Sequence, residues 1–494
     1  MHWNISKITQ TFASKIITGL VTVILSTTAT ANPTDVRVLV DVSGSMKKAD
    51  PKSVRGPATA LLAALLPDQS QGGIWLFGSD VRELVPYGLV DARWDALRQP
   101  IEASIGSTDR FTHMESALRK GIAADGDQTT RACHVILITD GIVDVKGGKD
   151  ASNASRDRIL KTVLPNATDR NCRIHTIALS DQADLPLLRQ MAIQTGGLFT
   201  LLNQPGDLIP VMLDALELAL RSQQLPIRNQ EIQVDSDVRQ VRLIRLGSEQ
   251  PIALRSKEQI IGASQQNDDL SYYSGAGYQT LIWSNPTPGR YTLTEQFGPS
   301  DRILIDSDVR LDLAELPPTI SADQTLGLSA SITRKGNRID TDTRQYFVAF
   351  GANVDPLRSE GQALAIQIDS PAVGRSILTV QSFDALYERQ VQRAFEVLEA
   401  SPAMEIGSEN SEGVGQVAST IAIQQANPTV TKSEVDRPIT ETLTTILPKT
   451  VTKRLPEEIR QWPLWQLIVS ALGAMAVVAL VIGLVLRPKA HSAE

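Results

Sequence analysis

The sequence predicts an α/β domain with a doubly wound, largely parallel sheet, followed by two all-β sandwiches and a C-terminal transmembrane helix. Three observations support this prediction. From Asp35 to about Arg221, apolar strands alternate with helical segments, which is typical of βαβ units. Short strands separated by turn residues then follow, as far as about residue 400. Residues 464–486 carry no charge and are long enough to cross a bilayer.

The hydrophobic pattern places each strand and helix of the α/β domain, to which we assign residues 33–225. We expect strands at 36–40, 73–78, 81–87, 134–139, 173–179 and 198–202, and helices at 57–66, 91–103, 114–124, 152–163, 185–194 and 207–221. The second and third strands are close enough in sequence to form a hairpin, whereas helices separate the others. This order predicts a sheet that is covered by helices on both faces.

The pattern changes after Leu225-Pro226, where turn residues begin to separate short strands of alternating polarity. Such a pattern is typical of all-β, immunoglobulin-like sandwiches. We assign one sandwich to residues 226–316 and a second, which begins at Pro317-Pro318, to residues 317–400. A helix over Asp384–Glu399 is an alternative to the strand that we expect at the end of the second sandwich.

The N-terminal residues 1–31 predict a secretory signal peptide. Lys7 and Lys15 precede an apolar run at 16–25, and Ala29-Thr30-Ala31 matches the small-residue cleavage pattern. An uncleaved anchor is the alternative, although the run is short for a hydrocarbon layer of about 30 Å. We therefore expect the mature chain to be exported.

The C-terminal part predicts a stalk and a membrane anchor. Residues 401–461 are poor in aromatic residues and rich in Ser, Thr, Glu and Pro in most of their length, so we expect a disordered linker. Trp462 and Trp465 border the apolar segment 464–486, and Arg487-Pro-Lys489 follows it. Aromatic residues outside and positive residues inside orient such a helix, so residues 487–494 are the expected cytoplasmic tail.

Composition narrows the classes of function. A length of 494 residues suggests about three domains. The formal net charge of -7 and the aromatic content of 4 % give no reason to expect a nucleic-acid partner, because such proteins usually present a basic face. Cys133 and Cys172 are the only cysteines, and an oxidising compartment allows them one disulfide.

The sequence Asp41-Val42-Ser43-Gly44-Ser45 directly follows the first strand. Alternate oxygen-bearing side chains in a tight, glycine-containing loop can turn toward one point. A carboxylate and two hydroxyls suit a hard cation such as Mg²⁺, Mn²⁺ or Ca²⁺ and offer no soft ligand to zinc or copper. The alternative is a strand-to-helix turn in which a serine caps the helix.

Two further residues are expected near this loop. Thr112 precedes the helix at 114–124, and Asp140 follows the strand at 134–139. Each has a simpler alternative role, Thr112 as a helix cap and Asp140 as a turn former. However, the C-terminal ends of parallel strands lie at one edge of a sheet, where ligands bind. We therefore expect both side chains to converge on the loop at residue 41.

In this order and spacing, the sequence resembles the von Willebrand factor A family and its metal-ion-dependent adhesion site, on a Rossmann-like fold. The resemblance covers roughly Asp35–Arg221 and extends to the turn at Thr195-Gly-Gly197. It implies five metal positions, which are Asp41, Ser43, Ser45, Thr112 and Asp140. Thr108 is the alternative to Thr112, which fits better because it lies at a helix entrance.

The resemblance also implies a mode of binding. Hydroxyls, carboxylates and waters would fill most of the cation's shell, and an Asp or Glu carboxylate of a protein partner would take the open position. In this family the last helix, here Asp207–Arg221, can shift when the site is ligated. The strands that begin near Cys133 and Cys172 are parallel neighbours in the family, so a Cys133–Cys172 disulfide is implied.

Motifs for enzyme chemistry are missing from the sequence. It has no G-x-G-x-x-G at the first strand-to-helix turn, and Gly148-Lys149 is followed by Asp150, which is not a phosphate loop. We therefore expect neither a nucleotide nor catalysis, with metal-assisted hydrolysis as a remote alternative. His113 is interpreted as an incidental exposed residue, and His134 and His175 as structural residues within strands.

The expected function is cation-dependent binding of a protein ligand, with the two sandwiches as spacers or secondary surfaces. The architecture resembles bacterial membrane-anchored proteins that carry this domain, which implies a single-pass inner membrane protein with most of the chain in the periplasm. The alternative is a scaffold or chaperone-like subunit of an envelope complex.

Overall fold

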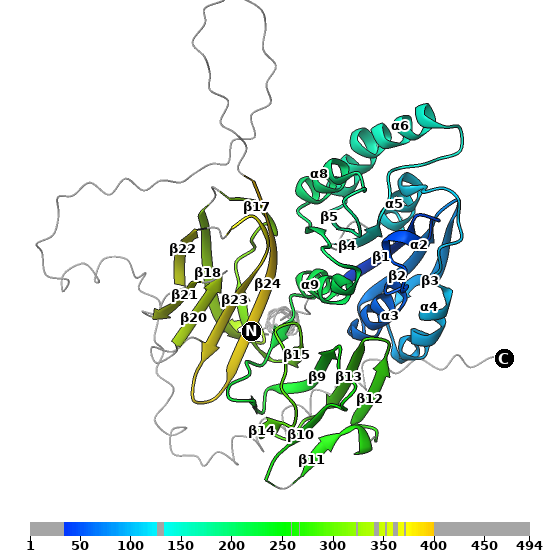
Figure 1. The fold of residues 1–494 in the computed structure, drawn as a ribbon. Coiled ribbons are helices and arrows are strands. Elements are labelled where there is room, and N and C mark those ends of the chain that lie inside the picture. The colour runs from blue at the N-terminus through cyan, green and yellow to red at the C-terminus, as the bar shows by residue number, and fades with distance from the viewer. Residues whose placement is uncertain are drawn as a thin grey trace, which may run out of the picture. The chain divides into compact units, whose positions relative to one another are not determined.

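Figure 1 shows the computed structural model of the chain. The structure describes residues 34–399 except 126–132, 258, 266, 323–324, 340–344, 351–352, 359–363 and 370–371. The expected signal peptide, stalk, transmembrane helix and tail lie outside the described residues. Among the described helices, none has the length and apolar character needed to cross a membrane.

The N-terminal part of the chain forms a mostly parallel sheet in the order β3-β2-β1-β4-β5-β6. Its strands are β1 (Asp35–Asp41), β2 (Gln71–Phe77), β3 (Val81–Leu89), β4 (Cys133–Thr139), β5 (Cys172–Ala178) and β6 (Phe199–Leu201). Only β3, in a hairpin with β2, is antiparallel. The strand order reverses between β1 and β4, which confirms the predicted doubly wound α/β domain.

Both faces of this sheet are covered by helices, so its strands are apolar on both sides. Val38 and Val40 of β1 pack with α3 (Arg55–Leu65) and α9 (Leu208–Leu220) on one face. Leu39 packs with α5 (Met114–Ile122) and α8 (Leu185–Thr195) on the other. Alternate residues of a strand point to opposite faces, and β1 therefore contributes to two separate cores.

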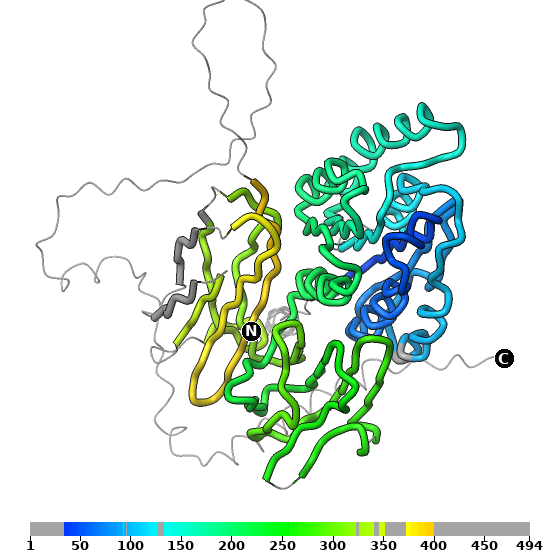
Figure 2. Tube along the Cα trace, viewed as in Figure 1, coloured from blue at the N-terminus to red at the C-terminus, as the bar shows by residue number. Residues whose placement is uncertain are grey.

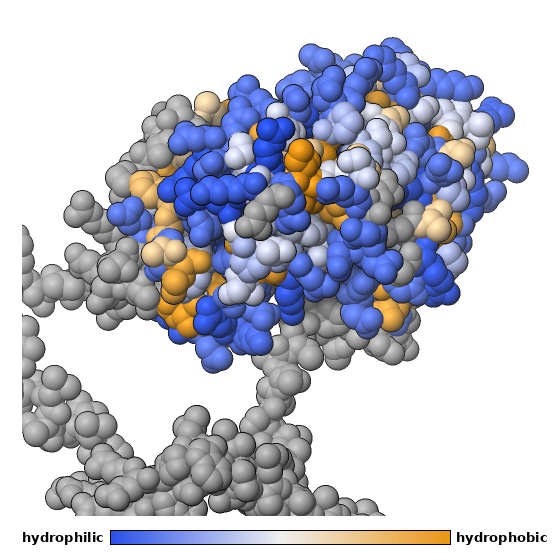
Figure 3. Space-filling view, turned by 90° about the horizontal axis from the view of Figure 1, so that it is seen from below, coloured by the Kyte–Doolittle hydropathy of each residue, from blue (hydrophilic) through white to orange (hydrophobic). Residues whose placement is uncertain are grey.

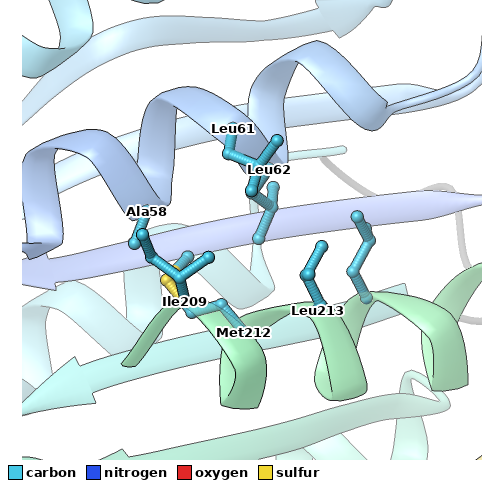
Figure 4. Close-up of a pocket in the computed structure, with 7 residues that line it drawn as sticks. Ala58, Leu61, Leu62, Ile209, Met212 and Leu213 are labelled. Atoms are coloured by element: carbon cyan, nitrogen blue, oxygen red, sulfur yellow. The ribbon is translucent and has the colours of Figure 1, made fainter. Parts of the chain in front are cut away.

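Helices α3 and α9 meet in an apolar seam (Figure 4). Ala58, Leu61 and Leu62 of α3 face Ile209, Met212, Leu213 and Leu216 of α9. The small Ala58 side chain lets the two helix backbones approach, and the larger side chains of α9 fill the remaining space. This seam fixes the position of the last helix of the domain.

Two predicted helices differ in form from the expectation. The first begins as a 3-10 helix (Ala92–Leu97) and continues as α4 (Arg98–Ser104). The second is longer than expected: α6 (Lys149–Arg158) passes through a π-helical turn (Ile159–Val163) into α7 (Leu164–Asp169). Pro165 follows the π-helical turn closely, and this wider turn accommodates the proline ring within a continuous helix. A short helix, α2 (Met46–Ala49), was not predicted.

The strand-rich region that the sequence predicts after this domain is confirmed. Its earlier strands are β7 (Gln223–Gln224), β8 (Glu231–Val234), β9 (Val238–Leu246), β10 (Ala253–Arg255), β11 (Ile260–Gly262), β12 (Leu270–Gly275), β13 (Tyr278–Ser284), β14 (Gly289–Leu293) and β15 (Arg302–Ser307). Its later strands are β16 (Val309–Leu313), β17 (Thr319–Ser321), β18 (Thr325–Arg334), β19 (Asn337–Arg338), β20 (Gln345–Phe350), β21 (Asn353–Arg358), β22 (Leu364–Asp369), β23 (Gly374–Phe383) and β24 (Glu388–Leu398).

These strands enclose two separate hydrophobic cores, one within 225–305 and one within 309–397. The sheets of the two cores join through β7, which pairs with both β15 and β24. Strand β16 pairs with β18, so the second core begins at Val309, before the boundary at 317 that we expected. The segment for which a helix was the alternative is the strand β24.

Buried ion pairs connect the α/β domain to both groups of strands. Arg302 of β15 donates to Asp214 (3.1 Å) and Glu217 (2.6 Å) of α9, and all three side chains are buried. Arg375 of β23 also pairs with Asp214. Helix α9 therefore lies between the first sheet and strands β23 and β24 (Figures 1 and 2). Removing either partner of such a buried pair leaves an uncompensated charge, which costs about 3–5 kcal/mol.

Two buried histidines, His134 near the start of β4 and His175 in the middle of β5, stack with ring centroids 5.3 Å apart. The Leu198 amide donates to Nδ1 of His175 (3.1 Å), so Nε2–H of His175 donates to Nδ1 of His134 (3.0 Å). Burial lowers the pKa of His175 to about 3 and the pKa of His134 well below its usual range. Both side chains are therefore structural, as expected.

The histidine pair predicts a dependence of stability on pH. Below pH 6.5 the unfolded chain protonates both residues and the folded chain does not, so each costs up to about 1.4 kcal/mol per pH unit as the pH falls. Buried carboxyl groups such as Asp41, whose pKa is raised, act in the opposite direction. We therefore expect His134→Gln to reduce the acid-induced loss of unfolding free energy relative to wild type, measured by urea denaturation between pH 7.5 and 5. Parallel pH curves for the two proteins would contradict this assignment.

Cys133 and Cys172 form the disulfide that the family resemblance implies. They are paired residues at the start of β4 and β5, with Cα atoms 4.4 Å apart. The bond therefore lies at the edge of the sheet opposite to Asp41 and Asp140, and its role is structural.

Removing this disulfide should destabilise the fold without changing the other edge of the sheet. It closes a loop with a sequence separation of 39 residues, so Cys133→Ala/Cys172→Ala should lose up to about 4 kcal/mol of unfolding free energy. Chemical denaturation measures the loss, and maleimide should label neither cysteine of unreduced, denatured protein. Labelling of both would show that the bond is not formed.

Candidate metal centre

Asp41 is the last residue of β1, and its side chain is fully buried. Its Oδ1 accepts a hydrogen bond from the Ser43 amide (2.8 Å), which turns the chain sharply after the strand. Its Oδ2 accepts from Oγ1 of Thr139 on the neighbouring strand (2.6 Å). Two local contacts therefore fix the carboxylate at the C-terminal edge of the sheet.

A chain of hydrogen bonds links the loop to the next strand. Ser43 Oγ lies 3.0 Å from Ser45 Oγ, and Ser45 Oγ donates to Oδ1 of Asp140 (2.9 Å). Ser45 is at the N-cap of α2 but makes no capping hydrogen bond, so the helix-cap alternative does not describe its side chain. Ser45 is exposed, whereas Ser43 and Asp140 are buried, so the cluster reaches the surface at Ser45.

Thr112, rather than Thr108, lies beside this cluster. A Cβ atom added to Gly141 would lie 3.3 Å from Cγ2 of Thr112 and 3.4 Å from Oδ2 of Asp41, so both residues adjoin the same glycine. Thr108 is exposed, and its hydroxyl donates to Asp109 (3.3 Å). Nor does Thr112 cap α5, because the N-cap residue of that helix is His113. The structure thus brings together all five residues that the resemblance implies.

The two carboxylates of the cluster lie in an environment that disfavours negative charge. Burial raises the pKa of Asp41 to about 6, and the nearby Asp140 contributes to this rise against hydrogen bonds from Thr139 and Ser43. Burial also raises the pKa of Asp140, against the effects of the Ser45 hydrogen bond and the Arg55 charge. A bound cation would stabilise the ionised form of both groups.

The donor set fits a hard divalent cation. It consists of two carboxylates and three hydroxyls, with no nitrogen or sulfur ligand among the five residues. No group of three or more His, Cys, Asp and Glu side chains in the described part of the chain is placed to hold a metal. Hydroxyl oxygens and water would therefore have to complete the shell of a cation at this cluster.

Two residues that support the cluster were not predicted. Thr139 orients Asp41 and also accepts a hydrogen bond from the Gly141 amide (3.0 Å). Arg55, on α3, donates to the backbone oxygen of Asp41, to Asp50 (2.7 Å) and to Ser107 (2.8 Å). The position of Thr139 at a strand end next to Asp140 was a usable signal. Nothing local in the sequence marks Arg55, which comes from another element.

The structure also places two other predicted features, His113 and the last helix of the domain. His113 is only partly exposed, and its Nε2 is buried without a hydrogen-bond partner among the described residues. The last helix, α9 (Leu208–Leu220), is bound by the buried ion pairs to Arg302 and Arg375.

Comparison with known proteins agrees with the fold. The model of the von Willebrand factor type A domain matches residues 35–207, and a search of curated proteins finds no match. Among solved structures, a von Willebrand factor type A protein from Catenulispora acidiphila is 11 % identical, with a TM-score of 0.34, over 75 % of this chain and 67 % of that one. The ArnB paralog VWA2 from Sulfolobus acidocaldarius is also 11 % identical, with a TM-score of 0.30 and the same coverage.

A third solved structure is proximal thread matrix protein 1 from the mussel byssus, with a zinc-occupied MIDAS motif. It is 16 % identical to this chain, with a TM-score of 0.30, over 40 % of this chain and 50 % of that one. The family match, together with the strand order and the motifs at its C-terminal edge, shows that residues 35–207 of this chain are a von Willebrand factor type A domain.

Proposed function

We propose that this chain is a membrane-anchored, periplasmic protein that binds a protein partner through a divalent cation at Asp41, Ser43, Ser45, Thr112 and Asp140. The observation that carries the proposal is the hydrogen-bonded loop of Asp41, Ser43, Ser45 and Asp140, with Thr112 beside it, at one edge of a parallel sheet. Domains of this type commonly mediate metal-dependent protein interactions. Mg²⁺ is the cation we favour, and Mn²⁺ and Ca²⁺ are compatible with the same donors.

Each residue has a distinct role in this proposal. Asp41 and Asp140 supply the negative charge, and Thr139 and Arg55 keep the loop in place. Ser43, Ser45 and Thr112 supply neutral oxygens, so the two carboxylates roughly neutralise a divalent cation and no further protein charge is added. A divalent cation held in this way is electrophilic enough to accept one further anionic oxygen. The exposed Ser45 marks the side from which a partner carboxylate can approach.

The proposed location rests on the two ends of the sequence. The apolar run at 16–25 with its cleavage pattern supports export. The uncharged segment 464–486, with tryptophans before it and Arg487 and Lys489 after it, supports one membrane helix with a cytoplasmic C-terminus. The Cys133–Cys172 disulfide is consistent with an oxidising compartment such as the periplasm.

Cation binding predicts a thermal shift that depends on Asp41. At a cation concentration of 100 times Kd, binding to the folded state alone stabilises it by about 2.7 kcal/mol. Wild-type protein should therefore melt at a higher temperature in Mg²⁺ than in EDTA, whereas Asp41→Asn should melt at the same temperature in both. Asp169→Asn, which changes an exposed carboxylate at the end of α7, is the matched control and should respond like wild type.

Scanning fluorimetry with Mg²⁺, Mn²⁺, Ca²⁺ and Zn²⁺ measures these shifts and ranks the cations. An equal response from wild type and Asp41→Asn would place the cation elsewhere and would remove the basis of the proposed function.

Partner binding predicts a second dependence on the same residue. Membranes from the source cells are solubilised, and the full chain is used to capture partners in Mg²⁺ or in EDTA. We expect wild type and Asp169→Asn to retain a protein in Mg²⁺ that neither EDTA nor Asp41→Asn retains. Retention of an integral-membrane protein by all variants, without Mg²⁺, would instead support the scaffold alternative.

A further inference from the structure

A pocket of about 300 Å³ lies between α5 and α6. Residues of both helices and of the loop before α6 line it, among them Ser116, Val145, Lys146, Ala154 and Arg158. It is open to solvent and combines small apolar side chains with two cationic ones. It has no role in the cation cluster itself, so its chemistry needs a separate explanation.

A short backbone bridge joins this pocket to the candidate metal centre. The Thr112 amide donates to the Asp144 carbonyl (2.7 Å), and the Asp144 amide donates to the Thr112 carbonyl (3.3 Å). His113 and Val145, which directly follow these two residues, both line the pocket. The pocket therefore adjoins the metal centre along the same edge of the domain, so that one peptide segment of a partner can contact both.

The charges of the pocket favour an anionic group. Glu115 is the one carboxylate among the described residues that line it, and it is already paired with Arg158 (2.8 Å) and Arg119 (3.0 Å) and accepts a hydrogen bond from Ser155 (2.8 Å). Lys146 is exposed and makes no ion pair or hydrogen bond within the described part of the chain. One ammonium group is thus left without a counter-charge beside a carboxylate that its neighbours already neutralise.

The surfaces around the pocket suit a peptide. Val145 and Ala154 can contact the methylene groups of a bound side chain. Ile142 lies two residues after Asp140 of the metal centre and is 59 % exposed. Exposed apolar side chains beside polar groups are common at protein-binding surfaces. By contrast, the hydrophobic residues on the face shown in Figure 3 lie in small, separate groups.

We propose that the α5–α6 pocket is a second subsite for the partner and binds an acidic side chain through Lys146. A second carboxylate of the same segment reaches the cation at Asp41 and Asp140. The partner is therefore a protein segment with two acidic residues at a fixed spacing. This inference rests on the proposed function, because one of the two carboxylates needs the cation.

A random heptapeptide library displayed on phage tests the proposal without knowledge of the natural partner. The full chain is used for selection in Mg²⁺, and peptides that EDTA releases are sequenced. Wild type should select peptides with two acidic positions. Lys146→Glu should keep one acidic position and select Lys or Arg at the other. Lys149→Glu, an exposed residue of α6 that does not line the pocket, should select the same peptides as wild type.

Calorimetry with the best wild-type peptide then measures the contribution of the subsite. Lys146→Ala should weaken binding roughly fivefold, as expected for one exposed charge pair, and Lys149→Ala should not change it. The Mg²⁺-induced thermal shift should be unchanged in both variants, which shows that they fold and retain the cation.

Three results would overturn the proposal. The first is selection of a single acidic position by wild type, and the second is selection of the same peptides by Lys146→Glu. The third is a failure to select any EDTA-releasable peptide, because the proposal requires a short acidic segment to bind. In each case, a Mg²⁺-induced thermal shift that wild type shows and Asp41→Asn lacks would still support the cation site. The second subsite can therefore be rejected without rejecting the cation site.

Discussion

Strands β1 and β4 run parallel from the pair Asp35–Cys133 to the pair Val40–Ile138, and the site depends on this register. It places Asp41 beside Thr139, whose hydroxyl donates to it, and brings Asp140 within reach of Ser45. A slip of one residue would turn every side chain of one strand to the opposite face, which would separate the two carboxylates. The apolar residues on both faces of the strands resist such a slip, because each is buried in its own core.

The buried charges of α9 constrain how this domain can respond to a ligand. In the family that the sequence resembles, the last helix can shift when the metal site is ligated. Here Asp214 and Glu217 of α9 pair with Arg302, and Asp214 also pairs with Arg375. A shift of α9 would have to carry both arginines with it or break buried ion pairs, at a cost of several kcal/mol. The strand-rich region is therefore connected to the helix by ion pairs that such a shift would have to move or break.

Much of the fold and of the site was predictable because the relevant signals are local. Asp41, Ser43 and Ser45 lie within one loop, and the strand before it was evident from its apolar residues. Parallel pairing then placed Asp140 at the same edge, and the family resemblance supplied the disulfide. Less local features were missed. The strand at Val309–Leu313 was not predicted, and its pairing with β18 joins segments that are separated in the sequence.

The sequence by itself determined the order of strands and helices and the two oxygen-rich strand ends, because these depend on periodicity and spacing along the chain. The tertiary structure decided what depends on contacts between distant segments. It placed Thr112 rather than Thr108 beside Asp41, brought Arg55 to the metal loop and bound α9 to Arg302. It also formed the pocket that leaves Lys146 without a counter-charge. Such contacts arise only when helices and strands pack, because packing selects which of many chemically similar side chains become neighbours.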